Sequence, residues 1–285
     1  MMDFAEFWPS DAPSLSEAKN YIEKYQNKKI ILKYGGQVMA TDQLSKAFAQ
    51  DAAVCKRVGA IPIVIHGGGP QIKEKLKQQN LESKFILGLR VTDEKVIKVV
   101  EEVLLNEINP DLVNTIKKYG VLSEPITVRN KNIIHIAKAI NPELGFVGDP
   151  DQINIELLNS VINDNIVPVI APMGLDATGQ VYNINADTAA GVVANKMEAE
   201  RLLLMTDVPG VNDKQGNLIS KLTIEEAEAL IANETITGGM IPKIRTCISA
   251  IRGGVKGVVI IDGRKPHAVL YELFSNQGAG TLIVQ

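Results

Sequence analysis

The chain has 285 residues, of which 45% are hydrophobic and 22% charged, and its formal net charge is -3 at pH 7. This composition supports a large buried core and excludes an intrinsically disordered chain. Charges of both signs are mixed, whereas a nucleic-acid-binding surface carries a clustered basic face. No apolar run reaches the ~18 residues that span a bilayer. We therefore expect no nucleic-acid or membrane partner, and a small anionic ligand instead.

The N-terminus and the cysteines bear on the cellular compartment. Residues 1–16 are acidic and lack the basic start of a signal peptide. Cys55 and Cys247 are isolated in helix-like patterns with no His or Cys at ligand spacing, which predicts buried free thiols rather than a disulfide or a zinc site. Both observations favour the cytoplasm.

The first predicted element is an amphipathic helix over Leu15–Tyr25, where Leu15, Ala18, Ile22 and Tyr25 share one face. That face needs an apolar partner. The pattern leaves open whether the partner is the helix's own domain or another subunit.

Strand-like runs then alternate with helical patterns, an order typical of an α/β protein with a mainly parallel sheet and helices on both faces. The predicted strands are 30–33, 61–66, 166–171, 201–206 and 257–261. The predicted helices are 43–58, 71–79, 94–106, 151–163, 188–196, 224–232 and 241–252. A β-hairpin is predicted over 121–140, with 129–131 as its polar turn. Ligands of such sheets lie beyond the carboxyl ends of the strands, so residues that directly follow strands are the site candidates.

The strand predicted at 61–66 ends in three consecutive glycines, 67–69, and Pro70 then opens a helix. Glycine has no Cβ, so the main chain can approach a phosphate closely, and the free N–H groups and helix dipole favour negative charge there. A second glycine turn, in Lys33-Tyr34-Gly35-Gly36, ends the first strand. Neighbouring strands would bring the two turns together around a polyphosphate. The chain has no Walker A loop, so its phosphate site is built differently.

Two further segments place polar residues at predicted helix starts. Asn183-Ile184-Asn185-Ala186-Asp187 precedes a helix of small residues, although Asp187 is also a good helix N-cap, an ordinary role worth ~1 kcal/mol. Lys243 lies in the first turn of a helix, where a lysine opposes the dipole unless an anion is bound. The ordinary alternative for Lys243 and Lys33 is a solvated lysine. His66 is interpreted as a packed strand-end residue.

Six motifs, in their order and spacing, closely resemble those of the N-acetylglutamate kinases of the amino acid kinase superfamily, and the likeness covers the chain from Tyr21 onward. They are Lys33-Tyr34-Gly35-Gly36, His66-Gly67-Gly68-Gly69-Pro70, Gly88-Leu89-Arg90-Val91-Thr92, Asn183-Ile184-Asn185-Ala186-Asp187, Thr206-Asp207-Val208 and Gly239-Met240-Ile241-Pro242-Lys243. Two positions depart from the pattern: Gln37 stands where the family usually has Asn, and Leu87 where it usually has Asn or Asp. We expect these departures to affect affinity rather than chemistry.

The resemblance implies a three-layer α/β/α sandwich with a mainly parallel sheet and two lobes, in which residues 26–199 hold the acyl amino acid and residues 200–285 hold the nucleotide. The implied reaction is ATP-dependent phosphorylation of the side-chain carboxylate of N-acetyl-L-glutamate to N-acetyl-L-glutamyl 5-phosphate, in arginine biosynthesis. Mg²⁺ is expected to enter with ATP, with no metal site built from protein side chains. Two alternatives stay open: a kinase of a homologous acyl amino acid such as N-acetyl-aminoadipate, and a non-catalytic arginine sensor.

The resemblance also implies residue roles. Lys33 and Lys243 are expected to neutralise the transferring phosphoryl group from either side, while Asp187 fixes both ammonium groups. Arg90 is expected to clamp the α-carboxylate of the substrate. The other expected ligand groups are Gly68, Gly69 and Asn183 for the substrate, and Gly35, Gly36, Thr206, Asp207, Gly210, Thr237, Gly239 and Met240 for the nucleotide. No general base is expected, because the acceptor carboxylate is already ionised at pH 7.

Both ends of the chain resemble those of arginine-inhibited relatives, in which an N-terminal helix interlaces dimers into a hexamer. Residues 1–25 are therefore expected to be an oligomerisation extension, and arginine a feedback inhibitor. The expected arginine site consists of Tyr21, Tyr25, His267, Glu272 and Gly278. Some relatives also bind a PII-type nitrogen-signalling protein, and a partner of this kind stays open.

Overall fold

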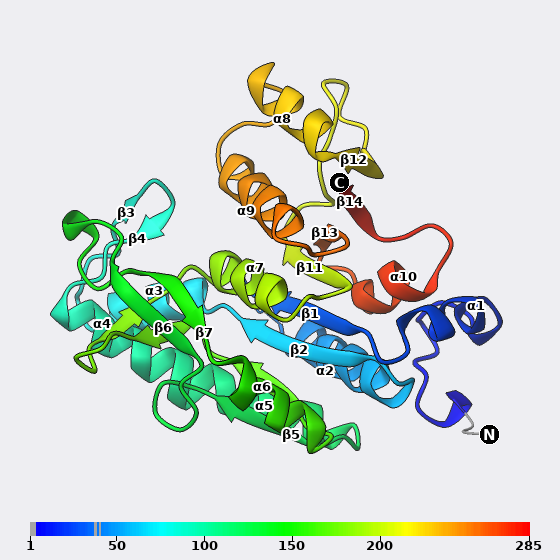
Figure 1. Cartoon of the computed structure of the whole chain (residues 1–285), viewed down its shortest axis with the longest axis horizontal. Helices are drawn as coiled ribbons and strands as arrows, with labels where there is room; N and C mark the ends of the chain where they lie inside the picture. The colour runs from blue at the N-terminus through cyan, green and yellow to red at the C-terminus, as the bar shows by residue number, and fades with distance from the viewer. Residues whose placement is uncertain (1–3, 37–38, 40) are drawn as a thin grey trace.

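The computed structural model describes residues 4–36, 39 and 41–285, so Gln37 lies outside the described residues. In the described part of the chain, eight strands form one sheet in the order β12-β14-β13-β11-β1-β2-β8-β5 (Figure 1). All neighbouring pairs are parallel except β13 and β14. The strands are β1 (Lys29–Tyr34), β2 (Ile61–His66), β5 (Ser123–Ile126), β8 (Val167–Ile170), β11 (Arg201–Thr206), β12 (Lys221–Thr223), β13 (Val258–Asp262) and β14 (Gly280–Val284).

Alternating side chains of these buried strands enter two separate apolar cores, one on each face of the sheet. Ile31 and its alternates pack against α6 (Ile155–Asn163), α7 (Ala186–Lys196), α8 (Ile224–Ala232) and α9 (Met240–Arg252). Ile30 and its alternates pack against α1 (Leu15–Tyr25), α2 (Asp42–Arg57), α5 (Asn109–Lys118) and α10 (Ala268–Phe274). The predicted three-layer fold with a mainly parallel sheet is therefore confirmed.

A third apolar cluster joins helices and short strands beyond the carboxyl end of β2 (Figure 1). Its helices are α3 (Gly69–Gln78), α4 (Glu94–Glu101) and the π-helix η3 (Glu102–Ile108), which continues into α5. A four-stranded sheet lies beside it, with β6 (Ile134–Ala139), β7 (Gly148–Ile153), β9 (Met173–Leu175) and β10 (Val181–Asn183). Met173 of β9 and Val181 of β10 join the third cluster, whereas the apolar residues of β6 and β7 join the core around Ile31. The hairpin of β3 (Phe85–Ile86) and β4 (Leu89–Arg90) projects from this part (Figure 1). The described residues also form the short helices η1 (Phe4–Glu6) and η4 (Pro142–Leu144).

The five predicted strands and most predicted helices form within a few residues of their expected bounds. The helix predicted over 151–163 begins only at Ile155, because Asn154 caps it, accepting a hydrogen bond from the Leu157 N–H at 3.0 Å, and the residues before it form β7. The helix predicted over 94–106 changes to π geometry at Glu102.

The predicted hairpin over 121–140 is wrong. Its first half, β5, pairs in parallel with β8, while its second half, β6, pairs with β7 in the other sheet. The Asn130 side chain separates the two halves, since its Oδ1 accepts hydrogen bonds from the N–H groups of Thr127 at 2.8 Å and Lys131 at 2.7 Å. Alternating hydrophobicity identified the strands but did not identify their partners.

Helix α1 packs on its own chain. Its apolar residues Ala18, Ile22 and Tyr25 are buried, and the helix lies beside α10 at one end of the molecule (Figure 1). The Tyr25 ring meets the Phe274 ring edge-on at 5.9 Å. Of the two partners left open for this face, the structure therefore shows the helix's own domain.

The β3–β4 hairpin contains a strained turn. Leu87 and Gly88 form its two-residue loop with φ values of 49° and 82°, and positive φ at both positions is the geometry that favours Asn-Gly. Leucine in this conformation costs about 1 kcal/mol or more, and the Leu87 side chain is 95% exposed, so packing does not offset the strain.

We predict that Leu87→Asn stabilises the hairpin by about 1 kcal/mol. The Val91 N–H is hydrogen-bonded to the Lys84 carbonyl across the hairpin, so its hydrogen exchange should become about 5-fold slower. Leu122→Asn is the matched control, because Leu122 is also exposed but has no positive φ. Equal exchange rates in the wild type and Leu87→Asn would contradict the strain argument.

Candidate active site

Lys33, Asp187 and Lys243 come from three different elements and meet at one edge of the sheet. Lys33 lies near the carboxyl end of β1, Asp187 in the first turn of α7 and Lys243 in the first turn of α9. The Lys33 Nζ is 2.9 Å from Asp187 Oδ1, and the Lys243 Nζ donates a hydrogen bond to Asp187 Oδ2 at 2.5 Å. The geometry agrees with the expectation that the Asp187 carboxylate contacts the ammonium groups of both lysines.

The charge state of Asp187 follows from its surroundings. Burial alone would raise its pKa, but the charges of Lys33 and Lys243 and their hydrogen bonds outweigh burial and hold the pKa well below its ordinary value. The carboxylate is therefore ionised at neutral pH. Asn185 is the N-cap of α7 and accepts a hydrogen bond from the Asp187 backbone N–H at 2.9 Å, which fixes the first turn of the helix that carries Asp187.

The two glycine turns lie side by side, because β1 and β2 are paired strands. A Cβ on Gly35 would lie 2.9 Å from the Gly67 backbone, so only glycine permits this approach. The Gly67 N–H donates to the Tyr34 carbonyl at 2.6 Å and ties the two turns together. Among the described residues, the N–H groups of Gly68 and Gly69 have no hydrogen-bond acceptor. This is the arrangement of an anion cradle.

A cleft of about 220 Å³ opens beside these glycines. Its polar lining comes from Lys33, Arg90, Asn183 and Asn185, together with the backbone of the glycine turns. Its apolar lining includes Ile72, Phe85, Leu89, Leu104, Val147 and Pro172. A site with a few convergent polar groups and apolar walls fits a small, partly apolar anion.

Arg90 is 8% exposed, and burial lowers the pKa of its guanidinium from the ordinary value. Its Nη2 donates to the Gly69 carbonyl at 3.0 Å and its Nη1 donates to Ser83 Oγ. No carboxylate of the described residues lies within ion-pair distance of Arg90. A buried cation without an anionic partner, at the wall of a cleft, is poised to bind an anionic ligand.

Asn183 is linked to the same wall. Its Nδ2 donates to Thr92 Oγ1 at 3.3 Å, and the Thr92 hydroxyl donates to the Arg90 carbonyl at 2.8 Å. Thr92 stands in one of the six motifs but had no expected role, and the sequence patterns did not single out Ser83. Asn185 had a signal, because it alternates with Asn183 before the helix, but it was absent from the expected ligands.

The residues expected to bind the nucleotide lie at the same edge, in four places. Gly35 and Gly36 follow β1. Thr206 ends β11 and Asp207 follows it, and the Thr206 hydroxyl donates to Asp207 Oδ1 at 3.3 Å. Gly210 lies against Thr281, whose Oγ1 would be 2.6 Å from a Cβ at that position. The last place, at the start of α9, holds Thr237, Gly239 and Met240.

An ion pair that was not predicted from the sequence lies next to them, at the end of β13. The Arg264 Nε and Nη2 donate to the two carboxylate oxygens of Asp262 at 2.9 and 3.0 Å. The hydrogen bond from Arg264 lowers the Asp262 pKa. A bidentate pair of this kind fixes the loop after β13.

Four of the five residues expected in an arginine site line one pocket of about 250 Å³ between α1 and the segment after α10. They are Tyr21, Tyr25, Glu272 and Gly278. The structure places the fifth, His267, outside this lining. The His267 Nδ1 lies 2.6 Å from Asp51 Oδ1 and its Nε2 lies 3.2 Å from Asp11 Oδ1, so it joins the start of α10 to α2 and to the N-terminal segment.

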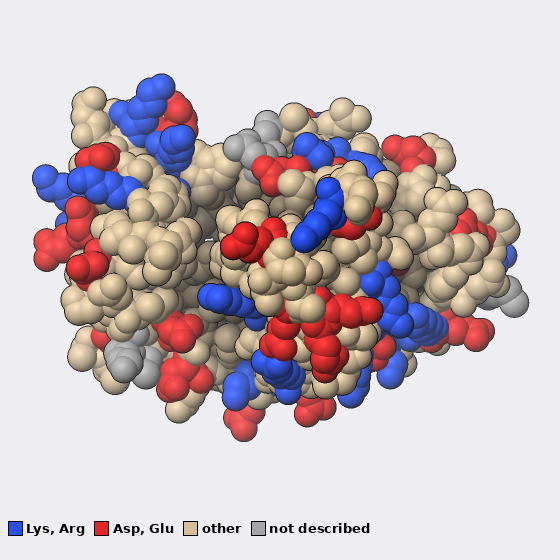
Figure 2. All heavy atoms as spheres, turned by 90° about the horizontal axis from the view of Figure 1, so that it is seen from above, with Lys and Arg blue, Asp and Glu red and all other residues tan. Residues whose placement is uncertain are grey.

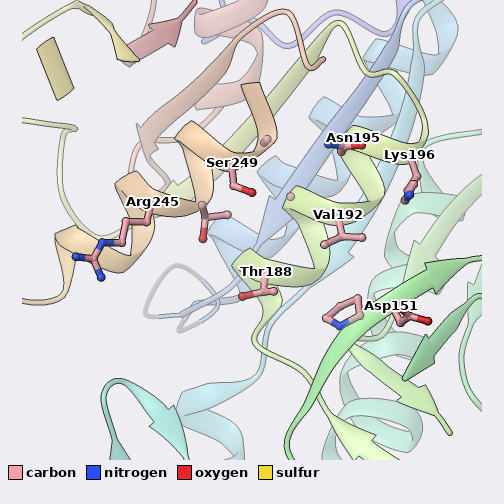
Figure 3. A pocket seen from close by; sticks show the side chains of 11 residues that line it. Asp151, Thr188, Val192, Asn195, Lys196, Arg245 and Ser249 are labelled. Atoms are coloured by element: carbon pink, nitrogen blue, oxygen red, sulfur yellow. The ribbon is translucent and has the colours of Figure 1, made fainter. Parts of the chain in front are cut away.

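A larger groove, about 470 Å³, lies on the outer side of α7 and α9. Figure 3 shows Thr188, Val192 and Asn195 of α7 and Arg245 and Ser249 of α9 around it. None of the residues expected in the site lines it. Over the face seen in Figure 2, basic and acidic side chains are interspersed. No helix in the described ranges has the length and apolarity to cross a bilayer.

Comparison with solved structures supports the fold. The chain superimposes on N-acetylglutamate synthase from Neisseria gonorrhoeae, complexed with coenzyme A and N-acetyl-glutamate, with a TM-score of 0.86 at 23% identity, covering 95% of this chain and 62% of the synthase. Carbamate kinase from Giardia lamblia bound to AMP-PNP gives a TM-score of 0.66 at 14% identity, covering 91% and 99%.

Sequence comparison is more specific. Acetylglutamate kinase of Bartonella henselae is 47% identical, with 98% of this chain and 97% of the relative covered. Acetylglutamate kinase of Brucella anthropi is 48% identical, with 96% of each chain covered, and that of Rhodopseudomonas palustris is 46% identical, with 99% of each covered. Residues 28–262 match the Amino acid kinase family. The chain therefore belongs to the amino acid kinase family and, within it, to the acetylglutamate kinases.

Proposed function

We propose that this chain transfers the γ-phosphoryl group of ATP to the side-chain carboxylate of N-acetyl-L-glutamate, giving N-acetyl-L-glutamyl 5-phosphate and ADP in arginine biosynthesis. The names of its relatives support this substrate. The observation that carries the proposal is the contact of both Lys33 and Lys243 with the Asp187 carboxylate, beside the glycine cradle.

The chemistry needs positioned charge more than it needs covalent help. One oxygen of the acceptor carboxylate attacks the γ-phosphorus, and the bond to the β–γ bridging oxygen breaks with its electron pair leaving on ADP. No proton moves, so the absence of an assigned general base is consistent with the step. Lys33 and Lys243 neutralise charge on the equatorial oxygens, and the N–H groups of Gly68 and Gly69 donate to them.

Arg90 supplies the substrate clamp in this proposal. Its guanidinium is already oriented by Gly69 and Ser83, so it loses little further freedom on binding a carboxylate. Asn183, which is linked to Arg90 through Thr92, holds another polar group of the substrate. The apolar walls of the cleft accept the methylene and acetyl groups.

We assign the acyl amino acid to residues 26–199 and the nucleotide to residues 200–285. The boundary between them separates β1 from β11, which are hydrogen-bonded neighbours, so the two lobes share one sheet. Among the described residues, no group of three or more His, Cys, Asp or Glu side chains is placed to hold a metal. Mg²⁺ is therefore proposed to be carried by the ATP phosphates. The two buried free thiols favour the cytoplasm as the compartment.

We predict that Asp187→Asn lowers kcat by about 10²- to 10³-fold, because both ammonium groups lose the charge that orients them. The KM values change much less, since the loss falls on the transition state. Steady-state rates with Mg-ATP and N-acetyl-L-glutamate test this. Asp164→Asn, at the exposed end of α6, is the control and keeps wild-type kcat. An active Asp187→Asn enzyme would refute the assigned role.

The substrate itself is tested by trapping the acyl phosphate with hydroxylamine. The proposal expects N-acetyl-L-glutamate to be turned over and N-acetyl-aminoadipate, which is one methylene longer, to have a kcat/KM lower by about 10- to 200-fold. Reversed preference would identify the homologous kinase, and no turnover of either would favour an arginine sensor.

We also propose that arginine inhibits the enzyme at the pocket between α1 and the segment after α10. Glu272 lies at one side, where burial raises its pKa and the Ala279 N–H donates to its Oε2 at 2.7 Å. Lys24 and Arg201 line the same pocket. An amino acid with a cationic side chain and a carboxylate has a partner for each end here.

We predict that Glu272→Gln raises the arginine concentration for half-inhibition by about 10- to 100-fold, as expected for loss of a charged hydrogen-bond acceptor. The rate without arginine stays unchanged, because the pocket does not include the residues around Asp187. Glu225→Gln, exposed in the first turn of α8, is the matched control. Unaltered inhibition in Glu272→Gln would place the arginine site elsewhere.

The proposed hexamer, with α1 joining dimers, has to accommodate the packing of α1 on α10. The contact with another subunit would use the exposed side of α1, which carries Lys19, Asn20 and Glu23. We predict a hexamer by light scattering for the whole chain, and dimers that arginine inhibits poorly when residues 1–25 are removed. Hexamers of the shortened chain with unchanged inhibition would contradict this role of α1.

A further inference from the structure

The proposed reaction does not use the imidazole of His66, a buried polar group beside the site. This residue ends β2 directly before the glycine cradle and is 0% exposed. It does not line the cleft. Its Nδ1 lies 2.8 Å from the Gly67 carbonyl oxygen, and its Nε2 lies 3.0 Å from Asn109 Nδ2.

The hydrogen-bond partners define the tautomer of His66. The Asn109 Nδ2 also lies 2.9 Å from the Val169 carbonyl oxygen, which only accepts, so the atom at this position is the nitrogen of the amide. That nitrogen donates to His66 Nε2, which must therefore be unprotonated. The ring proton is on Nδ1 and is donated to the Gly67 carbonyl. Burial lowers the His66 pKa to about 4, so the ring is neutral at physiological pH.

This hydrogen bond sets the direction of the next peptide N–H. In a trans peptide the C=O of Gly67 and the N–H of Gly68 point in opposite directions. Holding the carbonyl against the His66 ring therefore turns the Gly68 N–H away from the ring. Gly68 lines the cleft, and its N–H has no acceptor within the described protein.

Asn109 is itself held in place by the π-helix. It directly follows η3, whose Leu104 and Ile108 pack against Gly68 so closely that a Cβ there would lie 2.6 and 2.8 Å from their methyl carbons. Lys75 of α3 contacts both Glu102 and Glu107 of η3 at 2.8 Å. Residues five apart share one side of a π-helix, so a single lysine can join both to the helix that starts at the glycine cradle.

We propose that His66 and Asn109 are positioning residues that orient the Gly68 N–H toward the transferring phosphoryl group. This inference rests on the proposed function for its kinetic consequence. The chain of contacts runs from Val169 to Asn109, to His66, to the Gly67 carbonyl, and so to the Gly68 N–H. Neither side chain contacts the substrate.

The first test leaves His66 and Asn109 unchanged. The chain has three histidines, so their ring nitrogens can be resolved by ¹⁵N NMR and assigned by replacing His135 and His267 in turn. The inference expects His66 as the neutral Nδ1–H tautomer from pH 8 down to about pH 5. A signal for the Nε2–H tautomer would overturn the inference whether or not the enzyme is active.

The second test moves the proton. In Asn109→Asp a carboxylate faces His66 Nε2. When the imidazole is neutral and the new side chain is ionised, the single ring proton lies on Nε2, where it is donated to the carboxylate. Nδ1 then carries no proton, and its lone pair repels the Gly67 carbonyl oxygen. With a second proton the pair restores Nδ1–H. We therefore expect kcat near the wild-type value at low pH and about 10- to 100-fold lower as pH rises and the second proton is lost. The wild type shows no such dependence, and KM changes by less than about 3-fold.

His66→Phe is the second variant, because it removes the donor without adding charge. It lowers kcat by about 10- to 100-fold with no added pH dependence. Thr115→Val is the matched control. Like Asn109, Thr115 is buried on α5, but its hydroxyl donates only within that helix, to the Asp111 carbonyl. This control loses stability and keeps kcat.

The outcomes separate the two proposals. If the wild type turns over no N-acetyl-L-glutamate, the proposed function fails, and the tautomer measurement still decides the geometry. If the wild type is active and folded His66→Phe keeps its kcat, the positioning role is overturned. If Asn109→Asp does not fold, His66→Phe and the tautomer still test the inference.

Discussion

The contact of two lysines with one carboxylate is the constraint on which the site depends. Lys33 and Lys243 are positive and would repel each other in a site of low polarity, so Asp187 between them lowers the cost of bringing them together. The group as a whole stays positive by one charge, and the glycine N–H groups beside it add positive partial charge. Under the proposed function, this positive charge is available to a phosphoryl group that carries more negative charge than one carboxylate.

This constraint fixes how three elements must converge. Parallel strands bring their carboxyl ends to one edge, which places Lys33 beside the start of α7. The start of α9 reaches the same point because α7 and α9 pack closely, with Gly191 so near to Thr246 that a Cβ there would lie 3.0 Å from its methyl carbon. Lys243 opposes the dipole of its own helix, and Asp187 offsets this cost. Folding and charge placement therefore depend on each other.

Much of this was predictable from the sequence, and the exceptions share a physical cause. Strand ends, glycine turns and lysines are local features, and they were found. The hairpin at 121–140 was wrong because alternation does not select a partner strand. The π-helix was missed because π geometry occurs mostly as short insertions inside α-helices, and the apolar residues of this segment were read with the α-helical period alone. The contact of Asn109 with His66 spans 43 residues and depends on that π-helix, so no local pattern contains it.

The buried polar contacts of Asn109 and His66 are costly for stability. Asn109 Oδ1 is buried with no hydrogen-bond partner among the described residues, and an unsatisfied buried group of this kind costs about 1–3 kcal/mol. Two apolar residues of the same shape would avoid this cost. They would leave the Gly67 carbonyl without its donor, however, and the following N–H would be free to turn from the cleft. The pair therefore has its explanation in the geometry of the glycine cradle rather than in the stability of the core.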